Sequence, residues 1–201
     1  NWRDSSTEDD DLVPVLRQKL QTPAPVHELI VVHLLGQHFH YALRCGKQPG
    51  PFARLDNDAV MQTMIAQGRS PSIRQSRNDY DDATYCGARS VAQMLETVAK
   101  ARADRPLRVL YFSDHGQEVG HHRDFAGHSE QDDSGYTIPL WIWSNPLAPP
   151  LSSAHLDSAI RLDTLDQALQ HLLGIRSRWY DPAADFLSAD YRPALKALKD
   201  R

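Results

Sequence analysis

The amino-acid sequence predicts an α/β domain with a mostly parallel sheet and flanking helices. Three apolar runs with strand character lie at residues 28–35, 107–113 and 136–143. The first is rich in β-branched side chains and is closed by Gly36, a pattern typical of a strand that is covered on both faces. An amphipathic stretch at 79–100 separates the first two runs and is expected to be a crossover helix. Strands that alternate with helices in this way favour a mostly parallel sheet.

The remaining elements are expected to be helices and connections. Apolar spacing predicts a short helix at 12–20, behind an acidic turn, and another at 59–66, inside a connection at 46–76 that is punctuated by Pro and Gly. Helical periodicity also marks 163–173 and a terminal stretch at 190–198. No internal repeat and no low-complexity tract interrupts this organisation.

Composition narrows the class of protein. The 201 residues suffice for one sizeable core, and no break in composition demands a second domain. The net charge of -4 comes from well-mixed acidic and basic side chains, which argues against a nucleic-acid surface. No apolar run approaches the roughly 20 residues that cross a bilayer, and the polar start is no signal peptide, so we expect the chain as given to be soluble. Because position 1 is not Met, we expect a processed product or a piece of a longer protein.

Cysteine usage decides little by itself. Cys45 and Cys86 permit one disulfide or none. Their separation fits neither a Cys-x-x-Cys metal knuckle nor a dense disulfide scaffold. The redox compartment therefore stays open at this point.

Asp114 and His115 are the first candidates for chemistry. They come directly after the apolar run at 107–113, where a buried strand gives way to a loop. Ligands of open α/β sheets bind beyond the carboxyl ends of the strands, and a carboxylate oxygen with an imidazole nitrogen suits a zinc ion. The alternative is that Asp114 caps a turn before Gly116 and His115 merely packs.

Two further histidines flank the end of the first predicted strand. His33 and His38 lie on either side of Gly36, which lets the backbone turn so that both could face one site above the sheet. The alternative for His33 is a satisfied core histidine. His38 is the better candidate, because it follows the strand on the side where ligands collect. His40 has no such argument and is expected to lie on the surface.

The connection between the second and third predicted strands supplies three more imidazoles. They are His121, His122 and His128. A loop that joins neighbouring strands at one sheet edge can bring one of them back to Asp114, and His128, after a glycine, is the best placed. A solvated polar loop is the alternative, and His121 and His122 are the second choices.

Five segments together resemble a known superfamily. Residues 29–38 read Leu-Ile-Val-Val-His-Leu-Leu-Gly-Gln-His, 80–85 read Tyr-Asp-Asp-Ala-Thr-Tyr, and 109–116 end in Ser-Asp-His-Gly. Phe-Ala-Gly-His-Ser-Glu at 125–130 and Ile-Pro-Leu-Trp-Ile-Trp-Ser at 138–144 follow in the same order. These segments resemble the alkaline phosphatase and sulfatase superfamily, and within it the bacterial phosphoethanolamine transferases that modify lipopolysaccharide.

The resemblance implies an alkaline-phosphatase-like fold and a zinc site. By it, Asp114 and His115 bind zinc, while His33, His38 and His128 line the phosphate site as donors to phosphoryl oxygens or as ligands of a second metal. A metal with imidazolium donors stabilises the charge that a transferring phosphoryl group places on its oxygens.

The chain departs from the family pattern at several positions. Gln37 stands where the family commonly has Ser or Thr, and Gln117 followed by Glu118 stands where it has Glu. Phe39-His40 replaces Gly-Pro, and Arg44-Cys45-Gly46 replaces Arg-Tyr-Pro. These departures bear on the identity of the substrate rather than on the zinc site.

In the family the nucleophile is a Thr or Ser in the first half of the catalytic domain, and this chain has no match for it. Thr84 corresponds to a packing position. We therefore expect residues 1–201 to be the C-terminal portion of a larger, membrane-anchored protein, whose spanning helices and nucleophile lie upstream. The isolated chain is expected to be inactive, to bind zinc weakly or not at all, and to expose apolar sheet surface through which it could self-associate.

The resemblance implies part of a zinc-dependent transferase at the periplasmic face of the bacterial inner membrane. Its reaction would move phosphoethanolamine from phosphatidylethanolamine to a lipopolysaccharide acceptor, lipid A or a core sugar, through a phospho-enzyme. The alternatives are a sulfatase or phosphoglycerol transferase of the same superfamily, and a non-catalytic remnant that acts as a binding or assembly domain. The acceptor, the number of metals and the oligomeric state stay open.

Overall fold

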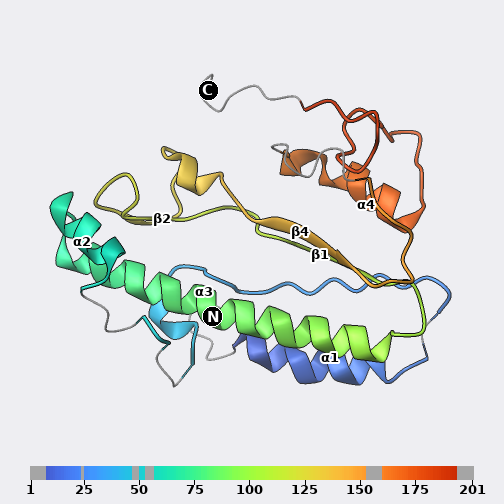
Figure 1. Cartoon of the computed structure of the whole chain (residues 1–201), viewed down its shortest axis with the longest axis horizontal. Helices are drawn as coiled ribbons and strands as arrows, with labels where there is room; N and C mark the ends of the chain where they lie inside the picture. The colour runs from blue at the N-terminus through green and yellow to red at the C-terminus, as the bar shows by residue number, and fades with distance from the viewer. Residues whose placement is uncertain (1–7, 24, 47–49, 53–56, 153–159, 194–201) are drawn as a thin grey trace. The chain divides into compact units, whose positions relative to one another are not determined.

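The chain divides into two compact units, Asn1–Ala148 and Pro149–Arg201. Figure 1 traces both, from the blue N-terminal end to the red C-terminal end. Each unit has fully buried side chains of its own, such as Val119 in the first and Ala168 in the second. The computed structural model describes residues 8–23, 25–46, 50–52, 57–152 and 160–193.

Helix α3, Pro71–Ala101, is the longest element of the first unit. At 1.5 Å per residue it is roughly 46 Å long. Pro71 occupies the first turn, where the missing N–H has no intrahelical partner to lose. The helix predicted at 79–100 is therefore confirmed but starts earlier, inside the segment expected to be an irregular connection. No helix in the described part of the chain has the length and apolarity to cross a bilayer.

Helix α1, Leu12–Leu20, confirms the helix predicted at 12–20 and packs against α3. Its apolar side chains recur at helical spacing, so Val13, Leu16 and Leu20 lie on one face and form a buried cluster with Met94 of α3. This cluster joins the two helices into one layer of the unit.

Helix α2, Ala59–Ala66, also has the predicted bounds. It begins at Asp58, whose carboxylate accepts hydrogen bonds from the N–H groups of Val60 and Met61 at 2.7 and 2.9 Å. A carboxylate at this position satisfies amide groups that have no partner within the helix. Met61 and Met64 are the side chains that α2 buries.

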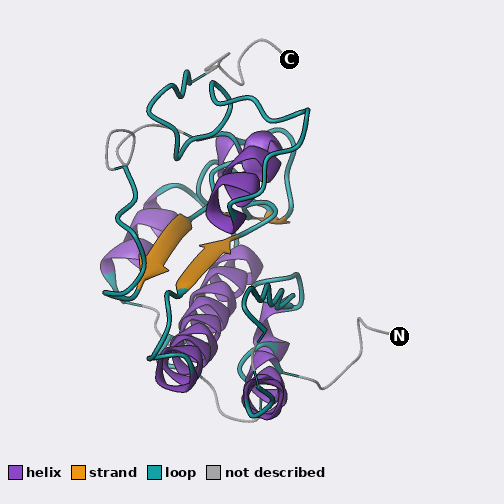
Figure 2. Cartoon of the chain, turned by 90° about the vertical axis from the view of Figure 1, so that its right-hand side faces the viewer, coloured by secondary structure: helices purple, strands orange, loops and turns teal. Residues whose placement is uncertain are grey.

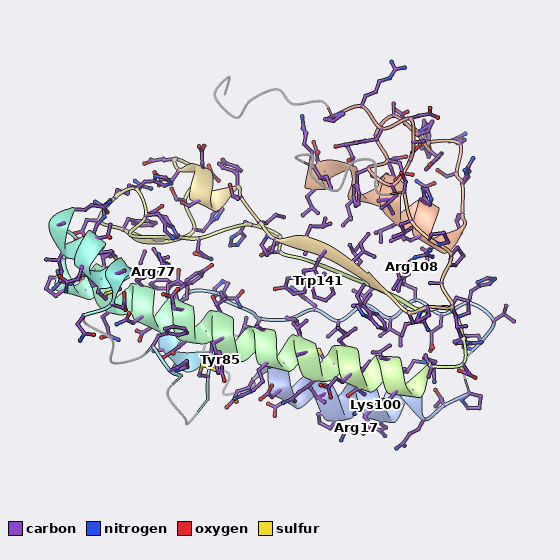
Figure 3. All side chains as sticks on the ribbon, viewed as in Figure 1. Arg17, Arg77, Tyr85, Lys100, Arg108 and Trp141 are labelled. Atoms are coloured by element: carbon purple, nitrogen blue, oxygen red, sulfur yellow. A yellow bond between two sulfur atoms is a disulfide. The ribbon has the colours of Figure 1, made fainter. Side chains whose placement is uncertain are left out.

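Strands β1, Arg108–Phe112, and β4, Leu140–Ser144, form an antiparallel pair. Figure 2 shows them as two neighbouring arrows that point in opposite directions. Tyr111 and Trp141 lie opposite each other, and their rings stack with centroids 5.3 Å apart and planes tilted by 17°. Trp141 projects from β4 toward α3 (Figure 3). Cross-strand aromatic pairs of this kind stabilise a sheet.

The predicted strands at 107–113 and 136–143 are thus confirmed in shortened form, but the expected parallel pairing is wrong for them. Both strand pairs in the described residues are antiparallel, including the short pair of β2, Glu118–Val119, with β3, Ala126–Gly127. Residues 113–139, which join β1 to β4, are described throughout and contain no α-helix. A parallel return needs a crossover connection, usually helical, so the chain returns antiparallel here.

Residues 28–35 run as a drawn-out trace (Figure 1) but are not part of a sheet in the described structure, so the strand expected there is not seen. One side of the segment packs, because Ile30 and Leu34 contact the α1–α3 cluster. The other side is open, with Leu29 60% and Val31 80% exposed. The apolar pattern is that of a strand, but a ladder also requires a neighbouring strand, and the described residues supply none.

In the second unit, helix α4, Leu165–Leu173, confirms the helix predicted at 163–173. A 3₁₀ turn at Leu162–Thr164 precedes it, and Gly174 ends it with a φ of 65°. Glycine adopts this left-handed conformation without the steric cost that a side chain would add. Of the terminal helix expected at 190–198, residues 190–193 are not helical and the rest lie outside the described residues.

Asp185 is the buried polar centre of the second unit. Its side chain is 0% exposed and accepts hydrogen bonds from Nδ1 of His171 and from the hydroxyl of Tyr180, both at 2.6 Å. The backbone N–H of Leu187 adds a third at 2.9 Å. Burial, together with the bond to Asp185, raises the pKa of Tyr180 to about 12, so this hydroxyl stays a donor at neutral pH.

Candidate functional site

Asp114 and His115 lie directly beyond the end of β1, as predicted. The Ser113 hydroxyl donates to the His115 carbonyl at 2.8 Å, and the His115 N–H donates to Oδ1 of Asp114 at 3.0 Å. These bonds hold the turn and leave Oδ2 of Asp114 at 3.9 Å from Nε2 of His115. The Asp114 side chain is 83% exposed, so its free oxygen is open to a ligand.

The His115 ring is oriented by the backbone. Its Nδ1 lies 2.9 Å from the carbonyl oxygen of Gly116. Because a carbonyl can only accept, Nδ1 carries the proton in this arrangement, so in the neutral ring the lone pair lies on Nε2, the nitrogen on the side of Asp114. A backbone carbonyl that fixes the tautomer of a histidine in this way is typical of metal ligands.

His128 is the loop histidine that reaches this place. It follows β3, and its ring centroid lies 4.2 Å from that of His115 with planes tilted by 49°. The choice between the three loop histidines, left open by the sequence, falls on His128. The structure therefore places two predicted site residues, Asp114 and His128, each beside His115.

His121 and His122 lie apart from this group. Both side chains are exposed, and Nδ1 of His121 is 4.0 Å from the Glu118 carboxylate. Burial of part of the ring, and then the charge of Arg77, lower the pKa of His121. His121 thus belongs to the surroundings of α3, from which Arg77 projects (Figure 3).

His33 and His38 do not complete the group. His33 is exposed on the extended segment, and His38 follows the turn at Gly36, where Arg44 donates to its backbone carbonyl at 3.2 Å. In the described residues no three His, Cys, Asp or Glu side chains are close enough to hold a metal ion together. The role of His33 and His38 at the phosphate site stays a prediction. Thr84, rejected as a nucleophile, donates to the Tyr80 carbonyl within α3.

Glu118 is a supporting residue that the sequence analysis noted only as part of a departure from the family pattern and not as a site residue. Its side chain is 0% exposed and accepts from the His122 N–H at 2.9 Å and from the Ser134 hydroxyl at 2.6 Å. It therefore ties the loop after His115 to the turn at Ser134. The one sequence signal for Glu118 is its place two residues after the Asp-His-Gly motif.

Close backbone packing fixes the same two loops. The Gly116 N–H donates to the Gly135 carbonyl at 2.8 Å, and a side chain at Gly116 would meet the Ser134 carbonyl oxygen at 2.0 Å. A side chain at Gly135 would meet the carbonyl oxygen of Ser129, the neighbour of His128, at 1.8 Å. Glycine is required wherever two backbones approach this closely.

A charged network anchors the chain directly after His128. Arg123 donates to Asp132 at 2.7 Å and to the Ser129 hydroxyl at 2.6 Å, and Ser129 in turn donates to Asp132 at 2.7 Å. The Ser129 bond, followed by the charge of Arg123, holds the pKa of Asp132 below its usual value. The network stays ionised at neutral pH and restricts the position of His128.

The segment after His38 is fastened to α3 and to the Asp114 loop. Cys45 and Cys86 form a disulfide, which settles their pairing. The buried Tyr41 hydroxyl donates to Oε1 of Gln117 at 3.0 Å. Burial raises the pKa of Tyr41, with Tyr80 adding to the effect, so the hydroxyl remains a donor. These links join the two segments that carry predicted site residues.

The donor set fits part of a zinc site. Asp114 offers a free carboxylate oxygen and His115 an oriented Nε2, which are two of the atom types that zinc prefers. A closed tetrahedral site needs four ligands, and the described residues provide two, with His128 as a neighbour. The arrangement can thus hold half of the ligand shell of one ion.

Comparison with known proteins gives consistent results. The sequence model of the sulfatase family matches residues 1–175. The phosphoethanolamine transferase EptC of Escherichia coli K12 is 28% identical over 193 residues, and the phosphoethanolamine transferase CptA of Salmonella typhimurium is 27% identical over the same length. Both alignments cover 92% of this chain and 32% of the relative.

Solved structures of the C-terminal periplasmic domain of E. coli EptC share the fold. One superimposes with a TM-score of 0.81 at 27% identity and covers 94% of this chain. A second, a complex with Zn, gives 0.82 at 28% identity. The α/β class and the expected likeness to this superfamily are confirmed, and a periplasmic domain agrees with the expected location.

The chain spans about half of that solved domain, 53% in the first structure, and about a third of the curated relatives. The resemblance to this superfamily, first seen at residues 33–38 and 114–116, is confirmed by a family match that extends over most of the sequence. The chain belongs to the sulfatase family.

Proposed function

We propose that the protein carrying this chain is a zinc-dependent phosphoethanolamine transferase. The observation that carries the proposal is the placement of Asp114 and His115 beyond β1, with His128 beside His115, in a chain that is 28% identical to an E. coli phosphoethanolamine transferase. The Zn complex of the similar periplasmic domain supports the choice of metal.

Each residue has a defined part in this proposal. Asp114 and His115 would hold the ion, His38 and His128 would donate hydrogen bonds to phosphoryl oxygens or bind a second zinc, and His33 would support them. A bound zinc supplies a Lewis acid and lowers the pKa of a coordinated hydroxyl. The carbonyl of Gly116 keeps Nε2 of His115 available for the metal.

The proposed reaction takes place at the periplasmic face of the inner membrane. A hydroxyl nucleophile, supplied from outside residues 1–201, would attack the phosphorus of phosphatidylethanolamine and release diacylglycerol. The phosphoethanolamine would then pass from the phospho-enzyme to a lipopolysaccharide acceptor, lipid A or a core sugar. The lipid donor and the acceptor are supported by the likeness to the transferases alone.

A non-catalytic binding or assembly domain is the second candidate. It is favoured by the open position of Asp114 and by the lack of a third ligand in the described residues. A sulfatase or a phosphoglycerol transferase would share the zinc ligands and differ in the leaving group. The substrate that the protein turns over distinguishes the enzymes from one another, and a binding domain would turn over none.

The test uses the complete gene product that contains this sequence, reconstituted with fluorescent phosphatidylethanolamine. We expect zinc-dependent release of labelled diacylglycerol, and a loss of at least about 100-fold for Asp114→Asn and for His115→Gln. Asp104→Asn with His27→Gln, two exposed positions, is the matched control and should keep full activity. Turnover of an aryl sulfate in place of the lipid would support a sulfatase, and no turnover of either would leave the binding domain as the better account.

A further inference from the structure

The end of α4 and the loop that follows it expose an unusual combination of side chains. We call residues 173–180 the arginine–tryptophan loop. Its apolar members are largely open to solvent, with Trp179 71%, Ile175 57% and Leu173 37% exposed. Arg176 and Arg178 alternate with them along the chain and are exposed as well.

Both arginines are held against aromatic rings. The guanidinium carbon of Arg178 lies 4.4 Å from the centroid of the Trp179 ring, and that of Arg176 lies 5.1 Å from the centroid of the Tyr180 ring. A guanidinium over an aromatic face is positioned without losing its hydrogen-bond donors. The loop therefore presents paired cationic and aromatic groups rather than scattered ones.

The two arginines of the loop form no ion pair with a described residue. In the described part of this unit the ion pairs are Arg161 with Asp163 and His171 with Asp185, so Arg176 and Arg178 take part in neither. The nearest acidic side chain along the chain, Asp181, accepts from the Ala183 N–H. Two guanidinium groups are thus available to an anionic partner.

The backbone beneath these side chains is well anchored. Gln170 accepts from the Ile175 N–H through its carbonyl at 2.9 Å and from the Ser177 N–H through its side chain at 2.8 Å. The Ser177 hydroxyl accepts from the Trp179 N–H at 3.1 Å, and Gln167 accepts from the Asp181 N–H at 2.7 Å. The exposed side chains sit on a preformed loop, which reduces the ordering cost of binding.

We propose that the arginine–tryptophan loop docks onto a bilayer surface that carries anionic lipids. Tryptophan is favoured at the level of the head groups, where its ring is amphipathic, and short apolar side chains beside it can enter the acyl boundary. Arginine binds lipid phosphates through paired donors. Charge complementarity favours this occupant over an apolar protein groove, which would leave two guanidinium groups buried without partners. The inference does not depend on the proposed reaction.

Vesicle binding of the 201-residue chain tests the proposal. Co-sedimentation is measured with phosphatidylcholine vesicles that contain phosphatidylglycerol, with phosphatidylcholine alone, and with phosphatidylcholine that contains phosphatidylethanolamine. We expect binding to the first kind only, and its loss at high salt. At about 1 kcal/mol for each arginine near the surface, Arg176→Gln with Arg178→Gln should weaken binding roughly 30-fold.

The matched control removes two cations elsewhere. Arg17→Gln with Lys100→Gln changes exposed residues on α1 and α3 (Figure 3) and should leave binding within a factor of about two of the original. Trp179→Ala should also weaken binding, while far-ultraviolet circular dichroism of every variant stays unchanged. Equal effects of the loop and control pairs, or equal binding to all three vesicles, would overturn the proposal. So would a loop-dependent association of the chain with itself in the absence of vesicles.

Discussion

The hydroxyl of Tyr41 donates a buried hydrogen bond of 3.0 Å to Oε1 of Gln117, and this bond joins two parts of the candidate site. Tyr41 lies three residues after His38, and Gln117 lies two residues after His115. Gln117 is also a position where the chain departs from its family, since a glutamine replaces the expected glutamate. A neutral amide oxygen accepts from a tyrosine without burying a charge.

Removal of the Tyr41 hydroxyl should destabilise the first unit. Tyr41→Phe leaves the buried Gln117 side chain without its donor, so we expect the free energy of unfolding in urea to fall by about 1–3 kcal/mol. Tyr85→Phe on α3, at a half-exposed side chain (Figure 3), is the control and should change stability by less than about 0.5 kcal/mol. Equal effects of the two substitutions would show that the bond has no energetic weight.

The cost of Tyr41→Phe should depend on pH in a defined direction. Burial raises the pKa of Tyr41 in the folded chain above the value of about 10 that the unfolded chain has. A raised pKa contributes stability that is fully present below about pH 10 and is lost as the pH rises further. The wild type loses this contribution and the variant has none to lose, so the difference between them should be constant up to about pH 10 and shrink as the pH rises above it. Urea unfolding at each pH measures it, and a difference that stays constant above about pH 10 would contradict the assignment.

Reduction of the disulfide should lower stability more than any single hydrogen bond. The link between Cys45 and Cys86 spans a sequence separation of 41, and its removal should cost about 2–4 kcal/mol. The comparison is urea unfolding with and without dithiothreitol. Cys45→Ser with Cys86→Ser should unfold at the midpoint of the reduced wild type and should not respond to dithiothreitol. An unchanged midpoint of the wild type on reduction would show that the disulfide does not stabilise the fold.

The buried carboxylate of Glu118 should be needed for the site loops. Glu118→Gln keeps the shape but replaces one accepting oxygen by an amide NH₂, which faces donors from His122 and Ser134. We expect a loss of about 2 kcal/mol in the free energy of unfolding. Glu96→Gln, at a side chain 71% exposed on α3, is the matched control and should cost less than about 0.5 kcal/mol. If Glu118→Gln costs no more than the control, the carboxylate does not hold the loops.

Local patterns predicted the elements that local interactions determine. The acidic turn before Leu12 and the helical apolar spacing at 59–66 and 163–173 are local sequence signals, and the three helices that they predict were found. The end of the strand before Asp114 could also be predicted from the sequence, because an apolar run is followed by polar residues there.

Features that depend on contacts between residues distant in the sequence could not be predicted from it. The pairing of Cys45 with Cys86 follows from the docking of one loop on α3, which neither cysteine signals. A glutamate is expected on the surface from sequence alone. The burial of Glu118 depends on the hydrogen bonds that His122 and Ser134 donate to its carboxylate. Residues 28–35 have the apolar pattern of a strand, but one side of the segment is exposed. Such a pattern predicts a conformation and not the neighbouring strand that completes a ladder.

The zinc content of the purified gene product tests the central claim most directly. The claim is that Asp114 and His115 bind zinc in a protein that contains this chain. Elemental analysis after purification without chelators should find near-stoichiometric zinc in the wild type and in the control Asp104→Asn with His27→Gln. It should find at most about a tenth of that in Asp114→Asn with His115→Gln. A wild type that holds no zinc, or a double variant that keeps the full amount, would contradict the account.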